Sequence, residues 1–187
     1  MKRLGKTSLF YKEEIIMNAY ENLTTRRSTR VFTDKKVEKE LIEKIVYAGQ
    51  CAPSGMNRQP LAYVVINDEE TIKNISKLNA AVMGAANDPF YGAKTIIVVL
   101  ANKELSKTTY LFDGALAMGN MLNAAHALGV NAIWIHRAKE VFASKEGLEY
   151  LKKWGLDERY EGIGNCAIGY GVANDTAKTI TSTVVWA

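Results

Sequence analysis

The sequence predicts an α+β domain built as three layers, α/β/α, with helices on both faces of a central sheet. Residues 95–100 form a continuous apolar run, which is typical of a strand buried on both faces. Segments with apolar residues at helical spacing precede and follow that run, and shorter β-prone runs separate them. A length of 187 residues with 48% hydrophobic residues is enough for one domain with a substantial core.

The first half of the chain is predicted to hold two helices and two strands. Apolar residues recur at helical spacing over residues 38–51, so this segment should be an amphipathic helix that ends before Pro53. The elements expected after it are a strand at 61–66, a polar helix at 69–78 and the central strand at 95–100.

Residues 109–128 are predicted to form a long helix that is buried nearly all round. Alanine, glycine and methionine dominate this segment, and Asp113 is its one formal charge. Small residues let another helix approach closely, and that helix could belong to a second subunit or to the same chain. The composition alone leaves both alternatives open.

The last third of the chain is predicted to end in a packed segment. The elements expected are a strand at 131–136, a helix at 145–154 stopped by Gly155, and a strand at 163–170. Residues 179–187 are β-prone and apolar at Val184-Val185-Trp186, unlike a disordered polar tail. We therefore expect this tail to pack on something.

Charge and cysteine content argue against several classes of function. The net charge is +4, but 24 basic residues are interspersed with 20 acidic ones, so no basic stripe for nucleic acid is evident. Cys51 and Cys166 lie far apart without a histidine cluster, so neither a metal site nor a redox pair is expected. With no secretory signal or membrane-length apolar run, we expect a soluble, cytoplasmic protein.

A first short segment suits a phosphate group. Residues 26–30 read Arg26-Arg27-Ser28-Thr29-Arg30 and concentrate three guanidinium groups and two hydroxyls. A guanidinium grips two phosphate oxygens at once, and a hydroxyl adds a short directional donor. Three close charges are, however, more often a solvated basic turn, so this segment alone is a weak signal.

A second segment, residues 53–60, combines turn residues with side-chain amides. It reads Pro53-Ser54-Gly55-Met56-Asn57-Arg58-Gln59-Pro60. Pro53 fixes φ, while Ser54 and Gly55 let the backbone come close to a ligand. Asn57 and Gln59 offer paired donor and acceptor edges of the kind that the pyrimidine ring of a flavin presents. Together the two segments predict a site for FMN.

The order and spacing of these two segments resemble the nitroreductase family of FMN-dependent oxidoreductases. That family carries Arg-Arg-Ser-x-Arg near its N-terminus and Pro-Ser-x-x-Asn-x-Gln-Pro after its first core helix. The similarity continues through residues 113–129, the strand at 131–136 and Ile168-Gly169-Tyr170, so it covers about residues 17–178. The chain departs from the family where Leu61 replaces a frequent Trp and where Lys178 stands for several late basic residues.

The resemblance implies a mixed central sheet and an intertwined homodimer with two flavin sites at the subunit interface. It divides the chain into residues 1–16, an extension of unknown role, and residues 17–187, a single FMN-binding domain. Within that domain it implies that the tail, residues 172–187, packs on the partner subunit.

The resemblance also assigns roles to individual residues. Arg26 and Ser28 should hold the FMN phosphate, with help from Arg27. Arg30 should reach the N1/O2 edge of the flavin, and a backbone N–H in the loop near 134–136 should face N5. The implied cofactor-binding residues are Arg26, Arg27, Ser28, Arg30, Pro53, Ser54, Gly55, Asn57, Gln59, Trp134, Ile135 and Lys178. No side chain is expected to act as acid, base, nucleophile or metal ligand.

Two other motifs do not predict a different chemistry. Residues 162–167 match the glycine pattern of a dinucleotide-binding loop, but the chain ends too soon for the βαβ unit and acidic ribose ligand that this motif needs. His126 and His136 lie ten residues apart without a nucleophile elbow or a helical metal partner. We interpret His126 as a packed or interface histidine and the His136 side chain as a bystander.

The expected function is therefore that of an FMN-dependent oxidoreductase. NAD(P)H would reduce non-covalently bound FMN, and a nitroaromatic, quinone or related electron-poor acceptor would then take the electrons in a ping-pong mechanism. Two alternatives remain open: a non-catalytic FMN-binding or electron-relay protein, and a specialised enzyme of the dehalogenase, flavin-degrading or azoline oxidase type.

Overall fold

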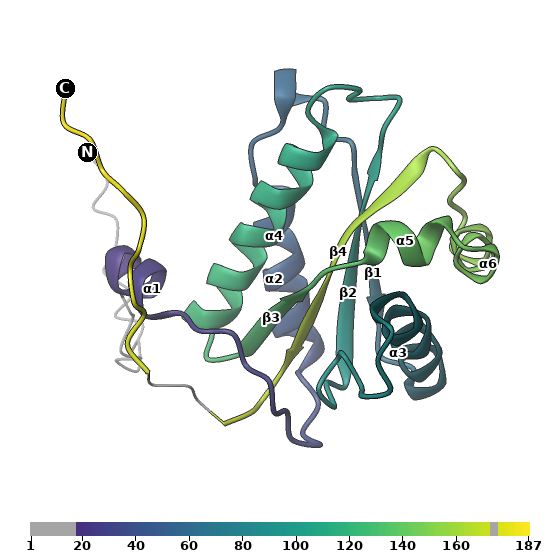
Figure 1. Ribbon diagram of the computed structural model, residues 1–187, viewed down its shortest axis with the longest axis horizontal. Coiled ribbons are helices and arrows are strands. Elements are labelled where there is room, and N and C mark those ends of the chain that lie inside the picture. The colour runs from purple at the N-terminus through teal and green to yellow at the C-terminus, as the bar shows by residue number, and fades with distance from the viewer. Residues whose placement is uncertain (1–17, 173–175) are drawn as a thin grey trace, which may run out of the picture.

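A four-stranded antiparallel sheet forms the centre of the molecule. The structure is a computed structural model that describes residues 18–172 and 176–187 (Figure 1). The strands lie in the order β1-β2-β4-β3. Their bounds are β1 (Leu61–Ile66), β2 (Thr95–Asn102), β3 (Asn131–Ile135) and β4 (Tyr160–Gly169). The helices are α1 (Ala19–Thr25), α2 (Lys39–Gln50), α3 (Glu69–Met83), α4 (Tyr110–Ala127), α5 (Ala138–Ala143) and α6 (Lys145–Lys153), with a 3-10 turn η1 (Gly55–Asn57).

Helices cover both faces of this sheet, which confirms the predicted three-layer α+β fold (Figure 1). On one face, α2 and α4 pack on a core that includes Ile97, Val99 and Met121. On the other face, α3, α5 and α6 enclose a second core around Ile75 and Phe90. Alternate residues of β2 enter the two cores, and Ile96 to Ala101 are fully buried, as expected for a central strand.

A mixed sheet was predicted, but among the described residues parallel pairing occurs at a single isolated bridge. The neighbouring pairs β1–β2, β2–β4 and β3–β4 are all antiparallel. A parallel component occurs where Ser28 pairs with Ala132 on the free edge of β3, and this is an isolated bridge rather than a strand. Phe32 makes a further isolated antiparallel bridge with Gly171. The chain leading into the domain therefore runs along the edge of the sheet without becoming part of it.

Helix α3 extends five residues beyond the predicted end at 78. It begins with Asp68 as the N-cap, whose carboxylate accepts a hydrogen bond from the Thr71 N–H, and it ends at Gly84 in the left-handed conformation. Two further helices, α1 and α5, were not predicted. Helix α1 has no buried residue, so it lacks the periodic apolar pattern that reveals a helix in a sequence.

The expectation that α4 is buried nearly all round is wrong within one chain. One face packs on α2 and the sheet, where added Cβ atoms at Gly114 and Gly49 would approach Ile163 and Met121 to 2.6 and 2.8 Å. The opposite face is open, with Phe112 69% exposed and Leu116 50% exposed. Small residues thus serve packing within the chain on one side and leave an apolar face on the other.

The apolar end of the C-terminal tail is exposed within one chain, although Arg27 donates to the Thr176 carbonyl near the start of the tail. Residues 176–187 form neither helix nor strand, and Val184, Val185 and Trp186 are all exposed (Figure 1). Packing of this tail on a partner subunit stays a prediction, and the proposed extension at residues 1–16 lies outside the described residues. Among the helices that the structure describes, none is long and apolar enough to cross a membrane.

Candidate functional site

The Arg-Arg-Ser segment lies where α1, the C-terminal end of α4 and the edge of β3 meet. The Asn22 side chain donates to the Asn123 carbonyl at 3.0 Å, and the Thr25 hydroxyl lies 2.9 Å from His126 Nε2. These contacts fix α1 to the end of α4. The chain then bridges to Ala132 through Ser28, so this segment is held from two sides.

Arg26 presents a buried donor at this junction. Its Nη1 atom is buried, and no hydrogen-bond partner for it occurs among the described residues. A buried donor without a partner costs free energy, and an anion would supply the missing acceptor. Burial lowers the pKa of His126, and the charges of Arg26 and Arg27 lower it further. The lowered pKa favours the neutral form of His126 beside the guanidinium groups. The arrangement suits a phosphate.

The other basic and hydroxyl residues that were predicted to bind the cofactor have different surroundings. Arg27 donates to the backbone carbonyls of Thr24, Arg26 and Thr176 at 2.9–3.0 Å, so it already ties α1 to the tail. Arg30 and Lys178 are exposed, and Ser28 is half-buried. Their contacts with a cofactor therefore stay predictions.

The amide-bearing loop is held in an unusual backbone conformation. Met56, Asn57 and Gln59 have φ angles of 53°, 53° and 48°, in the left-handed region that side chains disfavour. Internal bonds maintain it: the Gln59 N–H donates to Ser54 Oγ at 2.9 Å, and Gln59 Nε2 donates to Asn57 Oδ1 at 3.0 Å. Gly55 is required because a Cβ there would collide with Thr109. Contacts within the chain therefore hold the shape of this loop.

Asp113 anchors this loop to α4. It is 3% exposed and accepts the Gly55 N–H at 2.9 Å on one oxygen. Its other oxygen accepts the hydroxyls of Ser106 and Thr109 at 3.1 and 3.0 Å. The sequence contained a signal for this role, since Asp113 is the lone carboxylate on an otherwise apolar helix, but its partner 58 residues away could not be read from local pattern.

The two predicted halves of the site lie at opposite ends of α4 (Figure 1). Thr25, next to Arg26, contacts His126, whereas Gly55 contacts Asp113. At 1.5 Å per residue, the helix between Asp113 and His126 spans about 20 Å. A single chain therefore does not bring the predicted phosphate-binding residues and the amide loop into direct contact.

The predicted residues on β3 lie on opposite faces of the sheet. Trp134 packs against the core beneath α4, and its buried Nε1 has no partner among the described residues. Ile135 belongs to the core beneath α3 and α5. Neither side chain is free to contact a ligand broadly, so any contribution to a cofactor would come from the backbone at the end of this strand.

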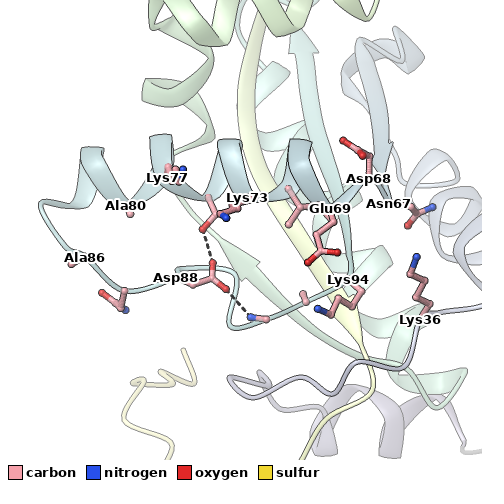
Figure 2. Close-up of a pocket in the computed structure, with 15 residues that line it drawn as sticks. Lys36, Asn67, Asp68, Glu69, Lys73, Lys77, Ala80, Ala86, Asp88 and Lys94 are labelled. Atoms are coloured by element: carbon pink, nitrogen blue, oxygen red, sulfur yellow. Dashed lines mark hydrogen bonds between the residues drawn. The ribbon is translucent and has the colours of Figure 1, made fainter.

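One large cavity lies away from all the predicted cofactor residues. It has a volume of about 640 Å³ and lies between α3 and residues 86–94 (Figure 2). Two of the carboxylates that line it have structural partners: Asp68 caps α3, and Asp88 bonds to Ser76 and to the Gly92 N–H across the pocket. Its lysines are Lys36, Lys73, Lys77 and Lys94. Size alone therefore does not mark the site.

A smaller cavity, of about 330 Å³, is lined by part of the amide loop. Pro53, Ser54 and Gln59 border it together with Leu61 and Tyr63. Burial raises the pKa of the Tyr63 phenol to about 12, and nearby Cys51 contributes to the rise, so the phenol stays protonated. Among the described residues, no group of three or more His, Cys, Asp and Glu side chains could hold a metal ion.

Comparisons with known proteins agree on one family. The family model described as the nitroreductase family matches residues 23–171. A protein of Archaeoglobus fulgidus provisionally named NADH dehydrogenase/NAD(P)H nitroreductase is 33% identical over 150 residues, which cover 78% of this chain and 81% of the relative.

Two solved structures carry the same fold. An FMN-dependent nitroreductase of Clostridium difficile R20291 superimposes with a TM-score of 0.71 at 26% identity, over 84% of this chain and 90% of that one. A provisionally named NADH oxidase of Clostridium acetobutylicum has a TM-score of 0.69 at 31% identity, over 87% and 94% of the two chains.

Proposed function

Because the chain belongs to the nitroreductase family, we propose that it is an FMN-dependent oxidoreductase that takes electrons from NAD(P)H. The observation that carries this proposal is the buried Nη1 of Arg26, which has no partner among the described residues and lies at the position where the family motif binds a phosphate. An anion at this point would satisfy a donor that no described residue pairs with.

The residues of the chain divide the work of holding FMN. Arg26, with Ser28 beside it, would bind the phosphate. The Asn57 and Gln59 amides would face the polar edge of the ring, on a loop that Asp113 already holds in shape. FMN, when bound, supplies reversible two-electron chemistry, and the protein positions it and excludes water.

The separation of the two half-sites supports a homodimer. If one chain supplied the Arg26 end and its partner supplied the amide loop, each dimer would hold two complete sites. The open face of α4, with exposed Leu111, Phe112 and Leu116, offers an apolar surface for such a partner. The exposed tail, residues 176–187, offers a second.

We further propose that one pocket serves both substrates in turn. NAD(P)H would bind, transfer hydride and leave before a nitroaromatic, quinone or similar electron-poor acceptor enters. We expect no side chain to act as an acid or base in this transfer. Arg30, if it lies near the N1/O2 edge, would stabilise negative charge there.

Steady-state kinetics with two substrates test this proposal. FMN-loaded protein should oxidise NADH or NADPH with a quinone as acceptor and give parallel double-reciprocal lines, as expected for alternating half-reactions. Anaerobic NAD(P)H should bleach the flavin absorbance without an acceptor. A protein that retains FMN but is not reduced by either nucleotide would instead favour an electron-relay or storage role.

A further inference from the structure

Asn79 connects α3 to the turn that follows β3. Its side chain is fully buried, and both ends of its amide are used. Asn79 Nδ2 donates to the backbone carbonyl of His136 at 2.8 Å, and Asn79 Oδ1 accepts from Arg137 Nε at 3.0 Å. The sequence placed this residue just beyond a polar helix, where nothing indicated a contact 57 residues along the chain.

This turn has a backbone conformation that needs external support. Arg137 has φ 73°, in the left-handed region that residues with side chains seldom adopt. Such conformations persist only where surrounding contacts determine them, and they concentrate at functional sites. Here the contacts are the two bonds to Asn79 and the first bond of α5, in which the Val141 N–H donates to the Arg137 carbonyl at 3.0 Å.

The bond from Asn79 also sets the direction of the next N–H group. In a trans peptide the C=O of one residue and the N–H of the next point in opposite directions, and no cis peptide bond occurs in the described chain. Since the His136 carbonyl points at Asn79 on α3, the Arg137 N–H points away from α3. That N–H donates to no acceptor among the described residues.

We propose that Asn79 is a positioning residue that orients the Arg137 N–H as a hydrogen-bond donor towards the reacting edge of the bound flavin. This inference rests on the proposed function, because it takes the turn after β3 to lie beside the cofactor. It assigns the role to one peptide and one supporting side chain, whereas the side chains of Trp134 and Ile135 remain in the two cores.

Asn79→Asp is the informative change. An aspartate keeps an oxygen for Arg137, so α3 stays tied to the turn, but it loses the donor to His136 and places a second oxygen against that carbonyl. The matched control is Asn120→Asp, because Asn120 Nδ2 donates to the Ala48 carbonyl at 3.1 Å between two other helices. Both variants lose one bond from an asparagine to a backbone carbonyl.

The first measurement needs no cofactor. In the FMN-free protein, hydrogen exchange of the Val141 amide, which donates to the Arg137 carbonyl, should be at least about tenfold faster in Asn79→Asp than in wild type. Asn120→Asp should leave this amide unchanged.

The second measurement separates positioning from general damage. In the FMN-loaded protein, the rate constant of flavin reduction at saturating NAD(P)H should fall by about tenfold or more in Asn79→Asp, as when an oriented donor is lost. The dissociation constants of FMN and NAD(P)H should stay within about threefold of wild type. Should Asn79→Asp not fold, the smaller, uncharged Asn79→Ser takes its place in both measurements.

The outcomes are distinguishable. If wild-type protein is reduced by NAD(P)H and Asn79→Asp is reduced within about twofold of its rate, the role of Asn79 is overturned while the proposed function stands. A parallel loss of rate and of both affinities, matching that of Asn120→Asp, also overturns it. If wild-type FMN-loaded protein is not reduced at all, the proposed function fails and the role of Asn79 fails with it.

Discussion

The two ends of α4 differ in whether the polar groups beside them have hydrogen-bond partners. At the Arg26 end, a buried guanidinium nitrogen lacks a partner among the described residues, while the neighbouring Arg27 donates to three backbone carbonyls. At the loop end, Asp113 satisfies three donors, and the strained backbone is held by further internal bonds. One end thus leaves an interaction for a ligand to complete, and the other is shaped in advance.

This difference suggests how the ends share the binding of a cofactor. An unpaired charge gives affinity, since the ligand relieves an existing cost. A loop held by internal bonds gives geometry, because those bonds restrict its conformations. The two contributions lie about 20 Å apart along one helix, so they act on one ligand only if it spans them or if two chains combine.

Mixing two defective variants gives the largest expected effect. One chain carries Arg26→Ala, and the other carries Asn57→Ala with Gln59→Ala, so that homodimers of either bind FMN poorly. If each site takes one end from each chain, a random one-to-one mixture refolded together should recover about a quarter of the wild-type FMN sites, because half of the dimers are mixed and each has one intact site. Fluorescence titration of FMN measures the recovery.

A site formed within one chain predicts the opposite outcome. In that case every site in the mixture contains at least one defect, and no recovery occurs. Sedimentation of the wild-type protein provides the control, since a monomer that binds FMN tightly would contradict the two-chain arrangement directly.

Removing the anchor of the preformed end should have the next largest effect. Asp113→Ala leaves the Gly55 N–H and the Ser106 and Thr109 hydroxyls without their shared acceptor. We expect the free energy of unfolding, measured by urea denaturation, to fall by about 3 kcal/mol or more. Asp113→Asn should lose less, because hydroxyl groups can rotate to accept from its amide. Equal losses in the two variants would assign the effect to charge rather than to the acceptor.

Replacing Arg26 should change the affinity for FMN and the stability of the FMN-free protein in different directions. Arg26→Ala should weaken FMN binding by more than about tenfold, since a bond to a charged group contributes roughly 1.5–3 kcal/mol. The FMN-free protein should be as stable as wild type or more stable, because a buried unpaired donor disappears. Titration of apoprotein and urea denaturation measure the two quantities.

Arg27→Ala is the matched comparison. It removes three bonds to backbone carbonyls, so the FMN-free protein should lose about 1 kcal/mol of stability, with a smaller change in FMN affinity than Arg26→Ala shows. A reversal of the two patterns would move the phosphate contact from Arg26 to Arg27.

The local sequence pattern predicted the four strands and four of the six helices, but not α1, α5 or the long-range contacts at the two ends of α4. Strand β1 matches the predicted residues 61–66, and α2 differs from its predicted bounds by one residue at each end, because burial repeats along the chain. The anchoring by Asp113 and the support from Asn79 depend on contacts 58 and 57 residues away. Likewise, both the open face and the buried face of α4 are mainly apolar, so the apolar pattern alone does not tell which face is buried.

The smallest expected effect concerns the strain in the preformed loop. Met56 is exposed and has φ 53°, so Met56→Gly relieves an unfavourable backbone conformation without removing a buried contact. The unfolded chain gains freedom from the glycine, so the net gain in stability should be about 0.5–1 kcal/mol by urea denaturation.

Gly84→Ala is the control for the opposite change, from glycine to a residue with a side chain at positive φ. Gly84 has φ 68° with no atom within 4 Å of an added Cβ, and the alanine should cost about 1 kcal/mol through strain alone. If the loop is strained because its shape serves the flavin, Met56→Gly should gain stability without gaining FMN affinity. A gain in both would mean that the strained shape opposes binding, and the contrast between a preformed end and an unsatisfied end would not hold.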